Sequence, residues 1–344
     1  MQLFYPSHDI ALAHGVRHFN PPAAALRLQE DLAYLADIWN QPFINGQTAI
    51  PQPWGWDWDT RLHIHKQYKV KISQLPTDSD LDMIRRLSSR QTTIALIEKL
   101  SSQLASLTYE QRSAICLTPP QYIDSEDKLW NFITSHDAKG KPFVLKTPWS
   151  SSGRGLILSR QTKQDGIIVE SDRSTMMNQA LSVIGKMGGI MGEEWLDTKV
   201  QDFAMLFYAS EQDVKFIGYS LFINDAGTYR EGRLLSNDKI VEQLNFDKAL
   251  LAEIASSYEI ILNELLLPLL GHPWHLGYLG IDMLTYHDPL RQTLCLHPSI
   301  EINLRCTMGV VCRLWYEQHQ REGTFRISPM MNNHHFKAEF LPTE

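Results

Sequence analysis

A lysine at the end of an apolar run, followed by a turn of small residues, is the first group that could do chemistry. In FVLKTPWSSSGRGL, residues 143–156, Lys146 precedes a Ser/Gly/Arg turn at 150–155. Backbone N–H groups in such a turn can face phosphate oxygens. A Walker loop needs a lysine directly after its last glycine, and here Leu156 follows Gly155, so that interpretation fails. With two glycines the segment also lacks a Rossmann fingerprint. Taken alone, it is more typical of a hairpin tip with a surface lysine.

Carboxylate and amide side chains with strand spacing form a second group. Asp282 in GID is followed by Glu301, Asn303 and Arg305 in EINLR. If 299–305 is a strand, the last three side chains point to one face, and an adjacent strand would bring Asp282 beside them. Two carboxylates and an amide oxygen suit Mg²⁺. The alternative is a solvated sheet face with an exposed Glu–Arg ion pair of ~0–1 kcal/mol. The composition of the strand favours the metal site.

The segment MGEEWLD, residues 191–197, links two strand-rich parts of the chain. Its backbone groups and acids could hold the edge of an adenine. An acidic connector with Trp195 in the core is equally compatible, so this segment decides nothing by itself.

Composition describes the whole chain as an ordinary globular protein. It has 344 residues, 43% hydrophobic and 21% charged, with a net charge of −7. The negative charge argues against nucleic acid or an anionic membrane as a partner. The cysteines, Cys116, Cys295, Cys306 and Cys312, lack metal-ligand spacing and are expected to be reduced thiols. We see no signal peptide and no membrane-spanning run, and we therefore expect a cytoplasmic protein.

Helices and strands alternate along the chain after residue 117, which favours an α/β or α+β class. Apolar residues at helical spacing predict helices near 28–38, from Asp80 to about Leu107, over 174–185 with a cap near Gly185, and over 247–270. Strands are predicted at 143–146, 156–159, 166–171, 203–210, 215–224, 280–286 and 299–305. The LTPPQYID stretch at 117–124 marks a domain boundary.

Two aromatic segments could also bind substrate. PQPWGWDWD, residues 51–59, makes Trp54, Trp56 and Asp57 candidates, although large aromatic residues usually fill a core. HIH at 63–65 would place two imidazoles on one strand face as a metal pair. No third ligand has a recognisable spacing, so we favour a structural role.

Over roughly residues 80–315 these segments together resemble the ATP-grasp superfamily. The resemblance makes Asp282, Glu301 and Asn303 the implied Mg²⁺ ligands. Arg305, Arg233 and Lys146 become the catalytic residues that balance phosphate charge, and Lys146 and Arg233 also contact ATP. Gly280 stands where some ligases carry an arginine, so Arg305 would steady the reacting carboxylate alone.

The same resemblance implies the rest of the nucleotide site. Glu193 would take the adenine amino group, Glu194, Trp195 and Leu196 would form the hinge with its backbone contacts, and Asp202 would take the ribose. Arg90 stands where many members carry a lysine, a departure that leaves its contact open. The implied phosphate lid consists of Ser150, Ser151, Ser152, Gly153, Arg154 and Gly155.

The implied fold has three parts: a Rossmann-like N-terminal domain at 1–116, a small central lid domain at 117–196, and a C-terminal mixed-sheet domain at 197–344 with the metal site. The implied activity is that of an ADP-forming ligase with ATP and Mg²⁺, or Mn²⁺ in its place. It would activate a carboxylate as an acyl phosphate and join it to an amine. The alternatives are a catalytically silent ATP-binding regulatory module and an ATP-grasp kinase. The expected partners are small-molecule substrates, with a homodimer left open.

Overall fold

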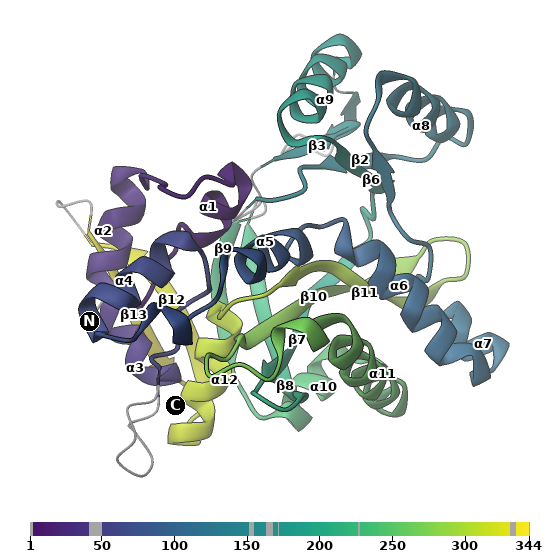
Figure 1. Cartoon of the computed structure of the whole chain (residues 1–344). Coiled ribbons are helices and arrows are strands. Elements are labelled where there is room, and N and C mark those ends of the chain that lie inside the picture. The colour runs from purple at the N-terminus through teal and green to yellow at the C-terminus, as the bar shows by residue number, and fades with distance from the viewer. Residues whose placement is uncertain are drawn as a thin grey trace.

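The computed structural model describes residues 3–40, 50–150, 155–162, 168–170, 172–225, 228–330 and 335–343. Figure 1 shows a small sheet with two helices standing above a larger body, which is built from N-terminal helices and a long antiparallel sheet. This mixture of helices and sheets confirms the α+β class expected from the sequence. No helix in the described part of the chain is both long and apolar enough to cross a membrane. The four cysteines are free thiols.

The N-terminal part is helical rather than Rossmann-like. Among its described residues, 3–40 and 50–116, no strand forms. Its apolar residues, including Phe4 and Trp54, share one core with Phe203 and other residues of the large sheet. A Rossmann-like domain needs a parallel sheet of its own, so the expectation for 1–116 is wrong on this point. The helices are α1 (His8–His14), α2 (Ala23–Asp31), α3 (Ala36–Trp39), α4 (Trp58–Tyr68), α5 (Asp78–Leu87), α6 (Thr92–Gln103) and α7 (Tyr109–Ser113).

Three local expectations in this region and the next need correction. The helix predicted from Asp80 to Leu107 is interrupted between α5 and α6. The HIH segment lies in α4 and not on a strand. The helix predicted to end near Gly185 continues to Met187, and the left-handed cap is Gly188, with φ 83°.

The small sheet has its own core. Its strand order is β1-β6-β2-β3 and all its pairings are antiparallel. Phe132 of α8 packs edge-on against Phe143 of β2, with ring centroids 5.3 Å apart. The elements are β1 (Gln121–Ile123), α8 (Glu126–Ala138), β2 (Phe143–Lys146), β3 (Leu156–Leu158), α9 (Arg173–Met187) and β6 (Ile190–Glu194), with the pair β4 (Arg160–Thr162) and β5 (Ile168–Glu170) beside them.

The large sheet has seven strands in the order β11-β10-β7-β8-β9-β12-β13. One face is apolar and packs on α11, where the rings of Phe207 and Tyr258 lie 6.5 Å apart. The opposite face carries the polar residues discussed below. Its elements are β7 (Lys199–Ala209), β8 (Val214–Asp225), β9 (Thr228–Leu234), α10 (Asn237–Leu244), α11 (Lys248–Leu266), β10 (Gly277–Asp288), β11 (Thr293–Asn303), α12 (Met308–His319), β12 (Gly323–Pro329) and β13 (Phe336–Pro342).

Candidate active site

Asp282, Glu301 and Asn303 lie on one face of two neighbouring strands, as the sequence predicts. Asp282 of β10 is directly opposite Glu301 of β11, and Gly280 is opposite Asn303. The Asn303 Nδ2 donates to Asp282 Oδ2 at 3.2 Å. Ile302, between Glu301 and Asn303 of β11, is buried in the core. The alternation of a strand therefore brings three oxygen-bearing side chains together.

The electrostatics of these acids fit a cation. Burial, followed by the negative charge of Glu301, raises the pKa of Asp282 to about 7, and Arg305 and Asn303 offset only part of this effect. The described residues contain no group of three or more His, Cys, Asp and Glu that could hold a metal. The candidate site instead uses an amide oxygen as its third donor, a hard-oxygen set of the kind that Mg²⁺ accepts.

Arg90 lies in the interruption between α5 and α6 and connects the two sheets. Its backbone N–H donates to Pro148 O at 2.8 Å. Its guanidinium donates to Thr147 O at 2.8 Å and to Ser150 Oγ at 2.7 Å, and it forms an ion pair with Glu301. Arg90 thus links the end of β2 to the acidic strand, and its role as a phosphate ligand remains a prediction.

Lys146, at the end of β2, forms an ion pair with Glu193 of β6. Burial alone would raise the pKa of Glu193, but Lys146 more than offsets this effect and holds the pKa below its ordinary value. The predicted phosphate ligand and the predicted adenine ligand therefore bind each other in this structure. Each side chain is nearly buried, with 10% and 14% exposed.

The hinge segment connects β6 to β7. Glu194 is exposed and pairs with Lys141 at 2.7 Å. The Trp195 N–H donates to Pro142 O at 2.9 Å and is therefore used within the protein. Leu196 follows at a half-buried position. The adenine contacts of Glu194, Trp195 and Leu196 stay predictions.

Asp202 lies on the same sheet face as the acids. It is opposite Leu284, two residues along β10 from Asp282. It pairs with Lys199 at 2.7 Å and accepts a hydrogen bond from Asn224 Nδ2 at 3.3 Å. The position is compatible with the ribose contact implied by the resemblance.

Arg233 is on the opposite face, so the structure does not bring it to the acids. Asp282 pairs with Ala204, which pairs with Ser220, and Phe222 on that same face pairs with Gly232. Because successive side chains alternate, Arg233 points away from the acids. It contacts Glu231 at 3.2 Å and Thr324 at 3.2 Å. The expectation of a phosphate ligand here is wrong, because the register of β9 cannot be read from the sequence.

Of the predicted phosphate lid, Ser150 and Gly155 are described, whereas Ser151, Ser152, Gly153 and Arg154 lie outside the described residues. Gly155 has φ +77°, and a Cβ there would come 2.4 Å from Thr147 Oγ1. Thr147 N–H donates to Gly155 O at 3.0 Å. Glycine at 155 is thus required by both backbone conformation and space.

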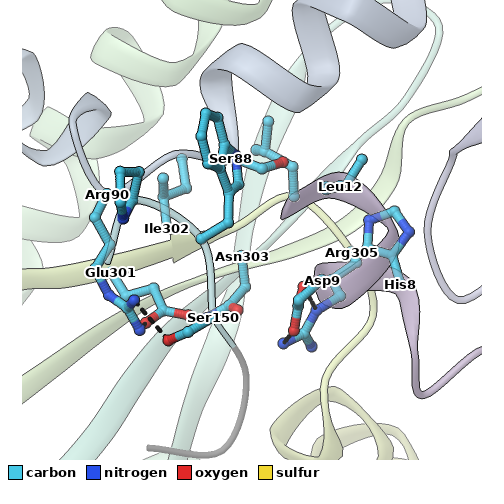
Figure 2. Close-up of a pocket in the computed structure, with 13 residues that line it drawn as sticks. His8, Asp9, Leu12, Ser88, Arg90, Ser150, Glu301, Ile302, Asn303 and Arg305 are labelled. Atoms are coloured by element: carbon cyan, nitrogen blue, oxygen red, sulfur yellow. Dashed lines mark hydrogen bonds and ion pairs between the residues drawn. The ribbon is translucent and has the colours of Figure 1, made fainter. Parts of the chain in front are cut away.

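Arg305 follows β11 and binds Asp9 of α1 through two hydrogen bonds, of 2.7 and 2.6 Å. Burial would raise the pKa of Asp9, but Arg305 holds it below its ordinary value. Figure 2 shows Asp9, Arg305 and His8 on one side of a pocket and Arg90, Glu301 and Ser150 on the other, with Asn303 between them. Asp9 was not predicted, since a single acid in an N-terminal helix carries no sequence signal.

His297 is a second residue that sequence reasoning missed. It lies on β11 opposite Leu284 and is 5% exposed. Burial lowers its pKa to about 4, with Glu193 opposing and Lys146 adding to the shift. Its Nδ1 has no hydrogen-bond partner in the structure. A neutral imidazole therefore lies beside the Lys146–Glu193 pair.

The aromatic segment fills the core, as we favoured. Trp54 is 4% exposed and Trp56 is 1% exposed. Asp57 accepts the Thr60 N–H at 2.7 Å and caps α4. In the HIH segment, His65 Nδ1 contacts Val70 O at 2.8 Å, so this ring has a structural partner.

No family model and no curated protein matches the sequence. Solved structures do resemble the fold, among them a biotin carboxylase–β-γ-ATP complex from Campylobacter jejuni. It is 11% identical with a TM-score of 0.47, and the match covers 84% of this chain and 60% of that one. The ADP complex of N5-carboxyaminoimidazole synthetase from Staphylococcus aureus is 11% identical, with a TM-score of 0.41 and coverages of 71% and 57%. D-alanyl-alanine synthetase A from Vibrio cholerae is 12% identical, with a TM-score of 0.41 and coverages of 69% and 62%.

The chain spans 57–62% of the length of the three structures. At these identities and TM-scores the similarity carries no argument about this chain, so functional roles have to come from its own residues.

Proposed function

We propose that the protein is an ATP- and Mg²⁺-dependent ligase that activates a carboxylate as an acyl phosphate and joins it to an amine. The observation that carries this proposal is the set of Asp282, Glu301 and Asn303 on one sheet face, with Arg90 and Arg305 beside it. Few roles other than cation binding explain two carboxylates held together where burial opposes their charge.

Asp282, Glu301 and Asn303 would hold the Mg²⁺. Bound there, the ion would supply positive charge that neutralises phosphate charge during phosphoryl transfer. The protein's own contribution is to hold the three oxygens on adjacent strands and to keep the surrounding sheet dry. Burial of Ile302 and Leu304, at 2% and 1% exposed, fixes the orientation of Glu301 and Asn303, which alternate with them along the chain.

Three cations of the site are each paired with a carboxylate of the site. The pairs are Lys146–Glu193, Arg90–Glu301 and Arg305–Asp9. We propose that ATP and Mg²⁺ exchange these partners. Phosphate would take the cations, the metal would take Glu301, and the adenine amino group would take Glu193. Such an exchange would give the three cations and Glu301 new partners of opposite charge, and Glu193 a hydrogen-bond donor.

We also propose that residues 117–196 act as a lid. Strand β2 of the small sheet ends at Lys146, and a loop begins at Ser150. Arg90 donates to Thr147 O and Ser150 Oγ and so joins this end of the small sheet to the acidic strand β11. The nucleotide would then lie between the two sheets, with Glu193 to Leu196 along its adenine edge and Asp202 at its ribose. The boundaries 1–116, 117–196 and 197–344 remain part of this proposal.

The proposal is tested by calorimetric titration of Mg·ATP, with metal-free controls, into the wild type and Glu301→Gln. We expect metal-dependent binding that the variant loses, because one charged ligand is removed. Glu264→Gln, an exposed acid paired with Lys99, is the matched control and should bind as the wild type does. Thermal melting shows whether each variant is folded.

Binding that Glu301→Gln retains would refute the metal assignment. If binding occurs, phosphate release decides the reaction. A ligase releases phosphate only with both substrates present, a kinase leaves it on the product, and a regulatory module releases none.

A further inference from the structure

His8 and Asp57 form a buried dyad that no part of the nucleotide site uses. His8 begins α1, and its Nδ1 lies 3.0 Å from Asp57 Oδ2. The other oxygen of Asp57, Oδ1, accepts the Thr60 N–H at 2.7 Å, which fixes the carboxylate at the start of α4. His8 is 1% exposed and Asp57 is 5% exposed. The dyad is therefore rigid and shielded from solvent.

The second ring nitrogen of His8 has no partner. Nε2 is buried and makes no hydrogen bond in the structure. An ionised carboxylate can only accept, so Nδ1 carries the proton toward Asp57 and Nε2 is left with a free lone pair. A link that merely ties α1 to α4 needs Nδ1 alone. Leaving the opposite nitrogen buried and unpaired is costly, which points to a ligand that completes it.

His8 lines the same cavity as the catalytic candidates. Asp9, Arg305, Glu301 and Asn303 line it with His8. Gly55 packs closely against both His8 and Arg305, because a Cβ at this position would lie 2.7 Å from His8 Nε2 and 2.9 Å from Arg305 Cβ. Figure 2 shows the His8 ring beside Arg305. The hollow has room for about one water molecule, so a substrate would enter only when the Asp9–Arg305 pair separates.

We propose that His8, oriented by Asp57, is the general base that deprotonates the amine substrate. This inference rests on the proposed ligase function. The ammonium form of the amine gives one proton to His8 Nε2, and Asp57 stabilises the resulting imidazolium. The nitrogen lone pair then forms the C–N bond as the C–O bond of the acyl phosphate breaks. A second nitrogen proton leaves with the phosphate as HPO₄²⁻, and the third remains on the amide.

The charged groups that face His8 are Asp9 on its own helix, Asp57 before α4, and Arg305 after β11. Asp57 is the carboxylate in contact with the ring, so it would pair with the imidazolium once the amine has given up its proton.

The test compares two small nucleophiles that differ in protonation. Hydroxylamine is largely unprotonated at neutral pH, whereas ammonium is largely protonated and needs a base. Phosphate release from Mg·ATP is measured with the twenty protein amino acids and simple mono- and dicarboxylates as carboxylate donors, first with hydroxylamine and then with ammonium chloride. The variant is His8→Asn, whose amide nitrogen can keep the bond to Asp57 but which has no base.

We expect His8→Asn to lower the ammonium-dependent rate ~10²–10⁴-fold and to leave the hydroxylamine rate nearly unchanged. The deficit should shrink at alkaline pH, where free ammonia is abundant. Asp57→Asn, which keeps a good helix cap, should show a weaker form of the same selective loss. His63→Gln, on α4 and outside the cavity, is the matched control and should behave as the wild type.

The outcomes separate the two proposals. If the wild type releases no phosphate with hydroxylamine and any of the carboxylates, the ligase function fails and the inference fails with it. If the wild type is active but His8→Asn slows both nucleophiles equally, the ligase function stands and the general base is refuted.

Discussion

Asp282 and Glu301 are held opposite each other on neighbouring strands although burial and mutual repulsion oppose their charges. The pKa of Asp282 rises from 3.8 to about 7 for this reason. A raised pKa means that the folded protein binds this proton more tightly than the unfolded chain. Protonation of Asp282 therefore contributes its full stabilisation of the fold below pH 3.8, and this contribution is lost as the pH rises through about 7.

We therefore expect Asp282→Asn to stabilise the metal-free protein above pH 7, by up to about 3 kcal/mol, while abolishing the Mg²⁺ response. The difference from the wild type should vanish well below pH 3.8, because Asp282 is then protonated in both the folded and the unfolded state. Thermal melts across this range, with and without Mg²⁺, measure both effects. A variant that is less stable than the wild type at high pH would contradict the charge-repulsion argument.

Lys146 and Glu193 make the opposite case, since each neutralises the other in a nearly buried place. We expect Lys146→Met to lower the free energy of unfolding by about 3 kcal/mol at neutral pH, because Glu193 is left buried and unpaired. The loss should disappear in acid, where Glu193 is protonated in both proteins.

The double variant Lys146→Met with Glu193→Gln should recover most of that stability, because it removes the orphaned charge. Urea unfolding of the wild type, Lys146→Met, Glu193→Gln and the double variant measures the coupling free energy between the two side chains. If the double variant is no more stable than Lys146→Met, the pair is not the cause of the loss.

Among the elements, the interruption between α5 and α6 decides where Arg90 lies. Apolar spacing continues through Leu87 and Ile94, which is why the sequence predicts one helix. The break is stabilised from outside: Arg90 N–H donates to Pro148 O, and Trp149 Nε1 donates to Arg85 O at 2.9 Å. The Arg85 guanidinium also lies 4.3 Å from the Trp149 ring centroid. Contacts with a segment some 60 residues away thus override local helix propensity.

In Arg90→Lys, lysine should not replace the contacts that Arg90 makes from its place between α5 and α6. The guanidinium reaches Thr147 O, Ser150 Oγ and Glu301 at once, and an ammonium point charge cannot reproduce that fork. We expect about tenfold weaker binding of Mg·ATP and a lower melting temperature, measured by calorimetry and thermal unfolding. Arg86→Lys, an exposed change on the preceding helix α5, is the control. An unchanged affinity of Arg90→Lys for Mg·ATP would show that the contacts of Arg90 do not position the site.

At the scale of the whole molecule, the described part of the chain has two separate cores. One lies in the small sheet around Phe132 and Phe143, and the other joins the N-terminal helices to the large sheet. Separate cores allow local opening of one part while the other stays folded. That arrangement suits a lid that admits a nucleotide.

Phe132→Ala should therefore act locally. Removing this ring, which is 2% exposed, costs about 3–5 kcal/mol in a core. In hydrogen exchange we expect faster exchange for amides of β1, β2 and β6 and unchanged protection for β7, β10 and β11. Phe207→Ala in the large core should give the reverse pattern. An equal loss of protection from exchange in both sheets, in either variant, would mean that the molecule unfolds as one unit.

The sequence by itself determined the features that depend on short-range periodicity. Alternation in 299–305 predicted the shared face of Glu301 and Asn303, and the apolar run before Lys146 predicted its strand. Residue type indicates a set of oxygen ligands for a cation, which stays a prediction. These features persist because a strand fixes side-chain direction at every second residue, whatever lies around it.

Tertiary structure alone decided the features that depend on register and on distant packing. The register of β9 turned Arg233 away from the acids, and contact with Pro148 broke the helix at Arg90. The N-terminal helices joined the large core and built no Rossmann-like sheet. Their packing brought Asp9 to Arg305 across 296 residues and His8 to Asp57 across 49. Pairings of this kind depend on burial against another part of the chain, and no local pattern encodes which part that will be.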